Sequence, residues 1–441
     1  MRFIETIKEY LEQQHLLDSD KRYLVALSGG ADSVCLLLVM RHLGYQIEAV
    51  HCNFHLRGEE SNRDEQFVVE LCKNQNIELH LIHFDTTTYA KTHQVSIEMA
   101  ARELRYRYFE QLRQDIGADG ICVAHHQDDS VETILLNLLR GTGIHGLTGI
   151  KARNGYILRP LLCVSRNEII AWLQAQHQTF VTDSSNLEDD VVRNKIRLNV
   201  IPQLKDISPT ACQQILSTAQ RLNETACVYD ATMRETLERL KNNDSIEIND
   251  LLREPSPESV LFEWLMPLGF APKTIESISC SLTNIQAGRE WQSTTHQLTI
   301  NQGRLLVEPI SDELPTLRIP EPGTYIYHET AKIRIEQMAG RHIEKEPSKA
   351  SLDSSKVEFP LTLRPVKAGD RFQPYGMKGT KLVSDYLTDK HLSIFEKRRT
   401  LVLCNKNGDI VWVVNHRPDA RFCLNDLSQE TVLFSFFNIK K

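Results

Sequence analysis

Between residue 22 and residue 126, short apolar runs alternate with helical stretches, and this alternation restricts the chain to few folds. The strand-like runs are YLVALS, QIEAVHCNF, IELHLIHF and GICVAHH. The helical stretches between them are SVCLLLVMRHLG, EESNRDEQFVVELCKNQ and SIEMAARELRYRYFEQLRQDIG. Strands that alternate with helices predict βαβ units, in which helices cover both faces of a parallel sheet. We therefore predict an α/β domain with a doubly wound, mostly parallel sheet, whose ligand lies beyond the carboxyl ends of the strands.

The length of 441 residues exceeds what one hydrophobic core normally serves, so we expect two smaller C-terminal domains after the sheet domain. Residues 1–205 form the predicted sheet domain, and residues 206–315 begin with a long helical stretch and continue as a mixed region. Residues 316–355 are rich in proline and charge, which favours a linker with some strand content. Residues 356–441 alternate strand-like runs with turns and predict a small mixed α/β domain.

Charge is unevenly distributed along the chain. The net charge of −7 argues against a generally basic nucleic-acid binder. Residues 364–399, however, hold nine Lys/Arg against four Asp/Glu, which suits a local phosphate-binding surface. Phe372, Tyr375 and Tyr386 lie in this segment and either stack on bases or form a small core. Core packing is the interpretation that we put first.

Neither the N-terminus nor the cysteines indicate export or membrane insertion. The start, MRFIETIKEYLEQQHLL, mixes charged with apolar residues and predicts an amphipathic helix. No run approaches the ~18 apolar residues of a membrane helix, so we expect no membrane contact. The ten cysteines form no CxxC pair and lie mostly in apolar runs, as buried thiols do in a reducing compartment. We expect a cytoplasmic protein without disulfides, zinc or iron–sulfur clusters.

The first strand leads directly into a glycine-containing loop, Ser28-Gly29-Gly30-Ala31-Asp32-Ser33, and a helix follows at once. Two glycines let the backbone turn tightly, and its amides, the serine hydroxyls and the helix N-terminus make a phosphate cradle. No Gly-Lys-Ser/Thr closes the loop, so it is not a Walker A loop. The alternative is a structural turn with an Asp/Ser helix cap.

The loop matches the SGGxDS signature and resembles the PP-loop enzymes, which have a Rossmann-like fold and split ATP between its α- and β-phosphates. The resemblance implies that the six loop residues bind ATP: Ser28, Gly29, Gly30, Ala31, Asp32 and Ser33. It also implies that Asp32 holds Mg²⁺ against the phosphates and takes part in catalysis.

Further motifs follow in order: AVHCNFHLRGEES, AHHQDDSVETILLNLLRGTGIHGLTGI, RPLL with SRNEI, and TDSSNLEDDVVRNKIRLNVIPQL. Their order and spacing resemble the tRNA(Ile)-lysidine synthetase family, strongly over residues 20–205 and more weakly over 360–425. The resemblance implies a ligase that adenylates the wobble cytidine of tRNA(Ile) with a CAU anticodon and joins L-lysine to it. The modified tRNA then reads AUA instead of AUG. It further implies tRNA contacts from the middle and C-terminal domains, and raises a homodimer as one option.

Asp129 and Glu132 lie three residues apart and project from one face of the helix that follows the fourth strand. Such a pair can hold an ammonium group, coordinate Mg²⁺ or take a proton. The resemblance implies the lysine and proton-handling roles for both. The alternative is a solvated acidic helix N-terminus, favoured by the helix dipole. His125 ends the strand and is expected in the ATP site. The alternatives are that His125 is a hydrogen-bonded core histidine, or that His126 is the one that faces the site.

Three further residues are assigned by the resemblance. Arg105 reaches the phosphates and completes a catalytic set with Asp32, Asp129 and Glu132, its alternative being an ion pair within its own helix. Asn186 and Arg197 close the sheet domain and contact lysine or tRNA.

Three other classes of protein fit the sequence less well. A tRNA thiolase would typically need reactive cysteines, often as CxxC pairs, and the sequence has no CxxC pair. A glutamine-dependent synthetase would need an amide-hydrolysing domain, and no such domain is evident. A nonenzymatic ATP- or RNA-binding module would require a broken cradle or lost carboxylates. Asp32, Asp129 and Glu132 are all present.

Overall fold

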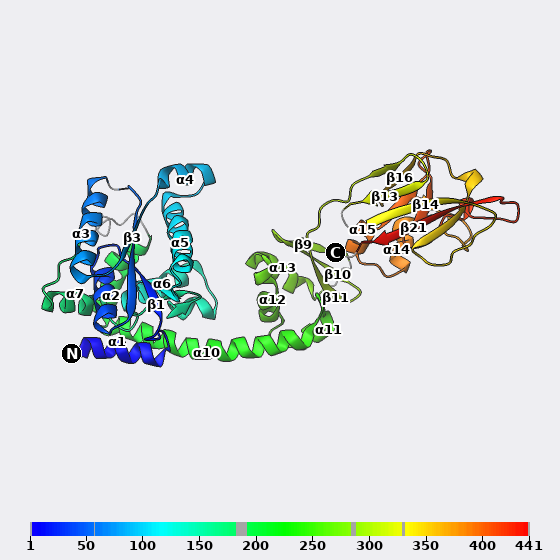
Figure 1. Cartoon of the computed structure of the whole chain (residues 1–441). Coiled ribbons are helices and arrows are strands. Elements are labelled where there is room, and N and C mark those ends of the chain that lie inside the picture. The colour runs from blue at the N-terminus through cyan, green and yellow to red at the C-terminus, as the bar shows by residue number, and fades with distance from the viewer. Residues whose placement is uncertain (1, 57, 182–191, 284–287, 329–330, 440–441) are drawn as a thin grey trace. The chain divides into compact units, whose positions relative to one another are not determined.

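The structure, a computed structural model, describes residues 2–56, 58–181, 192–283, 288–328 and 331–439. It divides into two compact units, Met1–Asp230 and Ala231–Lys441, which are described separately below (Figure 1). In the described residues, no helix is long and apolar enough to cross a membrane.

The first unit is built on a six-stranded sheet in the order β3-β2-β1-β4-β6-β5. Its strands are β1 (Arg22–Ala26), β2 (Gln46–Asn53), β3 (Leu79–His83), β4 (Gly120–Cys122), β5 (Arg153–Asn154) and β6 (Ile157–Leu158). All neighbouring pairs are parallel except β5 with β6. The predicted doubly wound, mostly parallel sheet is therefore confirmed.

Helices cover both faces of this sheet because alternate strand residues point to opposite sides. The helices are α1 (Arg2–Gln13), α2 (Ala31–His42), α3 (Glu59–Gln75), α4 (Thr86–His93), α5 (Ile97–Asp115), α6 (Gln127–Arg140), α7 (Arg166–Ala175), α8 (Val192–Lys195), α9 (Ile201–Ile207) and α10 (Ala211–Leu240). Tyr23 and Val25 pack with α1, α2, α3 and α7 on one face, while Leu24 packs with α5 on the other. Short helices η1 (Ile144–Leu147) and η3 (Ile196–Val200) complete the unit.

The second unit begins with a five-stranded sheet, β7-β8-β11-β10-β9, which shares a core with α12 and α13. Its elements are β7 (Lys241–Asn242), β8 (Ser245–Glu247), α11 (Ile248–Leu251), α12 (Pro257–Leu265), η4 (Met266–Leu268), α13 (Pro272–Ser281), β9 (Glu290–Gln292), β10 (His296–Asn301) and β11 (Arg304–Pro309).

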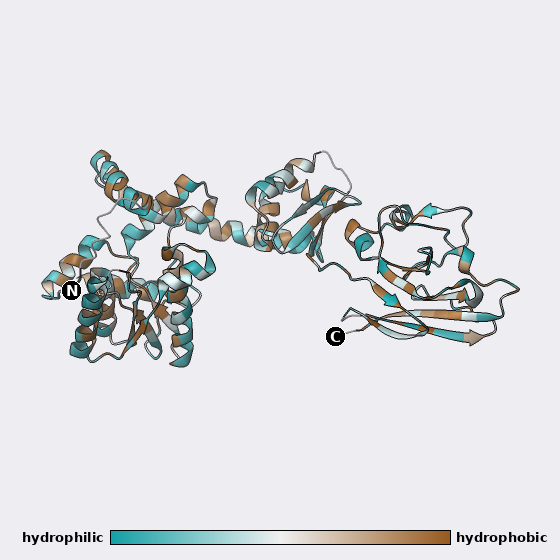
Figure 2. Ribbon diagram, turned by 90° about the horizontal axis from the view of Figure 1, so that it is seen from above, coloured by the Kyte–Doolittle hydropathy of each residue, from teal (hydrophilic) through white to brown (hydrophobic). Residues whose placement is uncertain are grey.

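Two four-stranded sheets follow, in the orders β12-β16-β19-β20 and β13-β14-β21-β15. Their elements are β12 (Leu317–Ile319), β13 (Gly323–Tyr327), β14 (Ala331–Ala339), β15 (Lys349–Asp353), η5 (Ser354–Lys356), β16 (Leu361–Pro365), β17 (Arg371–Phe372), β18 (Lys381–Leu382), α14 (Val383–Asp389), α15 (Ile394–Arg399), β19 (Leu401–Cys404), β20 (Ile410–Val413), η6 (Ala420–Phe422) and β21 (Glu430–Asn438). Apolar and polar residues alternate along several of these strands (Figure 2).

The segment 316–355, predicted as a linker with some strand content, contains more paired strands than that prediction implied. It supplies β12 to β15, which pair with β16 and β21 or with one another. The charges that favoured a linker lie on one face of amphipathic strands: in β14, Ile333 and Ile335 are buried while Lys332 and Arg334 are exposed. The other predicted domain boundaries stay predictions.

The aromatic residues of 364–399 separate into buried and exposed side chains. Phe372 and Tyr386 are buried and meet edge to face with ring centroids 5.1 Å apart, which confirms core packing for these two. Tyr375 is 56% exposed.

We expect Phe372→Ala to lower the free energy of unfolding of the second unit by about 3–5 kcal/mol, because it leaves a cavity in a closed core. Tyr375→Ala serves as the matched control and is expected to change it by less than about 0.5 kcal/mol. Urea denaturation followed by circular dichroism measures both. Equal stability losses in the two variants would contradict this assignment.

Candidate active site

The loop between β1 and α2 is braced by its own serines. The Ser28 N–H donates to Ser33 Oγ at 3.1 Å, and Ser33 Oγ donates to the Gly30 carbonyl at 3.0 Å. The two hydroxyl oxygens are themselves 3.0 Å apart. Gly29 has φ +90°, which residues with a Cβ rarely adopt, so glycine is required for this turn. The bracing leaves the loop in one conformation at the N-terminus of α2, where backbone amides favour an anion.

A cavity of about 400 Å³ opens at the carboxyl ends of β1, β2 and β4. Ser28, Gly30, Asp32 and Ser33 contribute one wall. The remaining walls come from the ends of β2 and β4 and from α5, and include Cys52, Asn53, Phe54, Arg102, Arg105, Tyr106, Phe109, Ala124 and His125. The cavity therefore joins the predicted phosphate cradle to apolar and aromatic surface that suits a nucleoside.

Two arginines of α5 face this cavity. The Arg105 guanidinium carbon lies 5.1 Å from the centre of the Phe54 ring, and that of Arg102 lies 4.8 Å from the centre of the Tyr106 ring. Arg105 therefore packs on an aromatic ring of the cavity wall, and no ion pair within its own helix is seen for it among the described residues. Stacked guanidinium groups at the cavity wall supply positive charge for phosphates.

The pKa values of the adjacent histidines after β4 are shifted in opposite directions. His125 lines the cavity, and its Nδ1 accepts a hydrogen bond from Arg159 Nε at 3.1 Å. Burial is the main cause that lowers the pKa of His125 to about 4. The Asp129 carboxylate opposes this shift, while the positive charges of Arg159 and Arg193 act in the same direction as burial. His125 is therefore neutral at physiological pH.

His126 is buried among carboxylates. Its Nε2 lies 3.7 Å from Asp32 Oδ2 and 3.6 Å from Asp129 Oδ2, and its Nδ1 lies 3.6 Å from Asp128 Oδ2. Burial alone would lower the pKa of His126, but these carboxylates, Asp32 first, raise it above the ordinary value. Both histidines thus belong to the site, in different roles.

Asp32 fits the cation that the PP-loop resemblance implies. Its Oδ1 is buried and has no hydrogen-bond partner, although its Oδ2 faces His126. An unsatisfied buried carboxylate oxygen is costly, and Mg²⁺ takes oxygen ligands of this kind. Asp32 also lines the cavity beside the phosphate cradle. The donor set therefore suits Mg²⁺ held between Asp32 and bound phosphates.

Glu132 is only 1% exposed, and two arginines from residues 193–197 contact its carboxylate. Arg197 donates to both of its carboxylate oxygens, at 2.6 and 3.0 Å, and Arg193 Nε lies 3.4 Å away. The hydrogen bonds to Glu132 raise the pKa of Arg197 above its ordinary value. Arg193 also donates to Thr133 Oγ1 at 2.7 Å. Glu132 is therefore a charge-compensated anchor for Arg197.

Asp129 differs from Glu132 in its bonding. Its Oδ2 accepts the His126 backbone N–H at 2.9 Å, which caps α6, and its side chain is 15% exposed. Neither side chain is freely solvated, so the alternative of an exposed acidic helix N-terminus does not hold. Asp129, Glu132 and Arg197 do not line the cavity itself, but Asp32 and His126 connect Asp129 to it. Asn186 lies outside the described residues.

The sequence reasoning missed one contact and one role. The motif RPLL contains Arg159 but indicates no function for it, and only the pairing of β4 with β6 places it beside His125. The sequence does not distinguish the role of His126 from that of His125, although the run of Asp128 and Asp129 after it is a signal for its charged surroundings.

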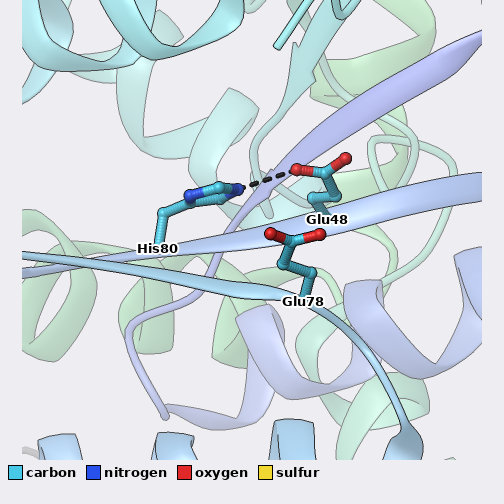
Figure 3. A group of neighbouring side chains, drawn as sticks. All are labelled: Glu48, Glu78 and His80. Atoms are coloured by element: carbon cyan, nitrogen blue, oxygen red, sulfur yellow. Dashed lines mark hydrogen bonds and ion pairs between the residues drawn. The ribbon is translucent and has the colours of Figure 1, made fainter.

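Within the described part of the chain, one further group of side chains has metal-ligand character: Glu48 on β2, His80 on β3, and Glu78 directly before β3 (Figure 3). Their ligand atoms lie within 4.8 Å of one another. Glu48 already accepts from His80 Nε2 at 2.7 Å and pairs with Arg22 at 3.0 Å. The group lies outside the cavity lining, and we interpret it as an ion-pair network.

Comparison with known proteins agrees with this site. A family model described as a PP-loop domain matches residues 2–204, a TilS substrate binding domain matches residues 240–310, and a TilS substrate C-terminal domain matches residues 361–433. A protein named tRNA(Ile)-lysidine synthase from Bacteroides thetaiotaomicron is 46% identical over 430 residues, covering 98% of this chain and 99% of its own.

Two further proteins with the same name are similar over nearly the whole chain. The one from Parabacteroides distasonis is 44% identical, covering 98% of this chain and 99% of its own. The one from Porphyromonas gingivalis is 38% identical and covers 96% of each chain. With the braced PP-loop, the cavity at the sheet edge and relatives matched from end to end, this chain belongs to the tRNA(Ile)-lysidine synthase family.

Proposed function

We propose that this ligase uses ATP to adenylate the wobble cytidine of tRNA(Ile) with a CAU anticodon and then joins L-lysine to the activated base. The observation that carries the proposal is the cavity in which the braced SGGADS loop, Arg105 and the unsatisfied Asp32 Oδ1 meet. These groups suit the triphosphate of ATP, and the aromatic wall suits its nucleoside.

The reaction that we propose has two steps. The base carbonyl oxygen of cytidine attacks the α-phosphorus of ATP, and pyrophosphate leaves. The ε-amine of lysine then loses a proton, attacks the activated base carbon and displaces AMP. The chain contributes by positioning these groups and by stabilising charge in a site of low dielectric.

Asp32 is the residue that would hold Mg²⁺, and the ion would supply positive charge against the phosphate oxygens. The loop amides and Ser28 bind the same phosphates from the side of α2, while Arg105 approaches from α5. Neutral His125 lines the same cavity and adds no charge of its own.

Among the two carboxylates first assigned to lysine, Asp129 is the better candidate for direct contact with its ammonium group. The Glu132 oxygens already accept hydrogen bonds from Arg197, whereas Asp129 uses Oδ2 for the helix cap and is partly exposed. We propose that Asp129 binds the ammonium and receives its proton, and that Glu132 acts by orienting Arg197 toward lysine or tRNA.

The first step can be tested without lysine. Incubation of the enzyme with tRNA(Ile) and ATP labelled at the α-phosphate is expected to transfer label to the tRNA, and added lysine is expected to release it as AMP. Label that never enters the tRNA, while lysine is still incorporated, would overturn the adenylate intermediate.

We expect Arg105→Ala to raise KM for ATP about 10- to 100-fold, because a charge-assisted contact to phosphate is lost. KM for lysine is expected to stay within about twofold. Initial rates at varied ATP and at varied lysine measure the two constants. Arg107→Ala is the matched control, since Arg107 lies on the same helix and outside the cavity lining.

Two accompanying predictions concern the protein in the cell. All ten cysteines carry free thiols, which supports work in the reducing cytoplasm. A homodimer remains a prediction from the family resemblance, and sedimentation velocity of the full chain would test it.

A further inference from the structure

Arg159 approaches His125 from the neighbouring strand. β4 pairs in parallel with β6, and the backbone N–H of Val123 donates to Leu158 O at 2.9 Å. The residues that follow the two strands, His125 and Arg159, therefore lie side by side at the carboxyl edge of the sheet. Arg159 is fixed there, because its NH1 donates to the Lys151 carbonyl at 2.7 Å while its Nε donates to His125 Nδ1 at 3.1 Å.

This contact determines which ring nitrogen of His125 carries the proton. A guanidinium group has only donors, so the nitrogen that it contacts must be an acceptor. His125 Nδ1 is therefore unprotonated, and the single proton of the neutral ring lies on Nε2. Since arginine stays charged at every working pH, the arrangement holds across the range in which the enzyme acts.

The neighbouring His126 shows that the arrangement is specific to His125. His126 faces three carboxylates, which favour an additional proton, whereas His125 faces a cation, which opposes one. Two consecutive histidines thus have side-chain partners of opposite charge within contact distance. Of these two histidines, His125 lines the cavity and His126 does not.

We propose that Arg159 is a positioning residue that locks His125 as its Nε2–H tautomer, so that His125 donates a hydrogen bond to the nucleotide in the cavity. The inference rests on ATP binding in this cavity, as proposed above. A fixed neutral donor adds no reorganisation when charge develops on the nucleotide. An Nδ1–H tautomer would present an acceptor to the nucleotide instead, and an acceptor repels phosphate oxygens.

The tautomer can be observed independently of activity. Nitrogen NMR of the full chain with labelled histidine, at pH 7, is expected to show His125 with an unprotonated Nδ1 and a protonated Nε2. The His125 signals are identified by their loss in His125→Gln. In Arg159→Met, the His125 signals are expected to shift toward a mixture of tautomers. Wild-type His125 as an Nδ1–H tautomer or as imidazolium, or unchanged signals in Arg159→Met, would overturn the proposal.

Kinetics test whether Arg159 acts through His125. Arg159→Met is expected to lower kcat/KM for ATP roughly 10- to 100-fold, as for a lost hydrogen bond to a charged group. Arg159→Lys, which can still donate to Nδ1, is expected to recover part of this loss. Gln places an amide N–H near the position of the histidine Nε2–H. In a His125→Gln background, Arg159→Met is therefore expected to cost less than about threefold.

The control variant is Arg153→Met, an arginine on adjacent β5 that donates to Leu16 O at 2.8 Å and lies outside the lining of the ATP cavity. It is expected to leave both the tautomer and kcat/KM for ATP unchanged. Additive losses from Arg159→Met and His125→Gln would show that Arg159 acts separately from His125. If Arg159→Met does not fold, the NMR spectrum of the wild type still tests the proposal, because His125 must show the Nε2–H tautomer. Arg159→Lys then supplies the kinetic comparison.

Discussion

Asp32→Ala is expected to lower kcat for lysidine formation by about 10²–10³-fold, the effect of removing one well-placed electrostatic contact to a transition state. Asp32 combines three features: it lies in the phosphate loop, it lines the cavity, and its Oδ1 is buried without a hydrogen-bond partner. A carboxylate so placed is costly to the fold and is explained by a positive ligand. Steady-state rates with saturating ATP, lysine and tRNA(Ile) measure the loss.

Stability and tRNA binding separate this prediction from general damage. Because the variant removes a buried unsatisfied oxygen, its Tm is expected to equal or exceed that of the wild type. Its affinity for tRNA is expected to stay unchanged. Asp206→Asn, at an exposed site on α9, is the matched control and is expected to keep full activity. An Asp32→Ala enzyme within threefold of wild-type kcat would remove Asp32 from the mechanism.

Arg197→Ala is expected to lower the free energy of unfolding of the first unit by about 2–4 kcal/mol, because among the described residues it leaves Arg193 as the one ion-pair partner of the buried Glu132 carboxylate. Arg193 and the partial exposure of Arg197 keep the loss below that of a fully buried pair broken on one side. For a unit of this size, the Tm is expected to fall by roughly 2–4 °C for each kcal/mol.

Two comparison variants sharpen this test. Lys8→Ala breaks an exposed pair with Glu12 at 4.0 Å and is expected to cost less than about 1 kcal/mol. The double variant Glu132→Leu with Arg197→Met removes both charges and is expected to be more stable than Arg197→Ala. A stability loss no greater for Arg197→Ala than for Lys8→Ala would contradict the role of Glu132 as a buried anchor.

The sequence predicted the sheet domain well because its signals are local. The helix predicted from EESNRDEQFVVELCKNQ is α3, with the same bounds, Glu59–Gln75. The loop at Ser28 to Ser33 was placed correctly between β1 and α2, since two glycines and a following helix are visible in a short window. Local periodicity suffices where a strand, a turn and a helix follow one another.

The contacts that were not predicted join distant parts of the chain. Arg159 is 34 residues from His125, and Arg197 is 65 residues from Glu132. Such pairs depend on the order of the strands in the sheet and on how a later helix packs. A short stretch of sequence carries neither kind of information. The charges of 316–355 misled for a related reason, because an amphipathic strand and a charged linker have similar composition.

The most direct test of the function is incorporation of labelled lysine into tRNA. With ATP and Mg²⁺, we predict incorporation into tRNA(Ile) with a CAU anticodon, and none without ATP or into methionine tRNA with the same anticodon. Incorporation that proceeds without ATP, or no incorporation while ATP is still cleaved to AMP and pyrophosphate with another RNA or amine, would contradict the proposed reaction.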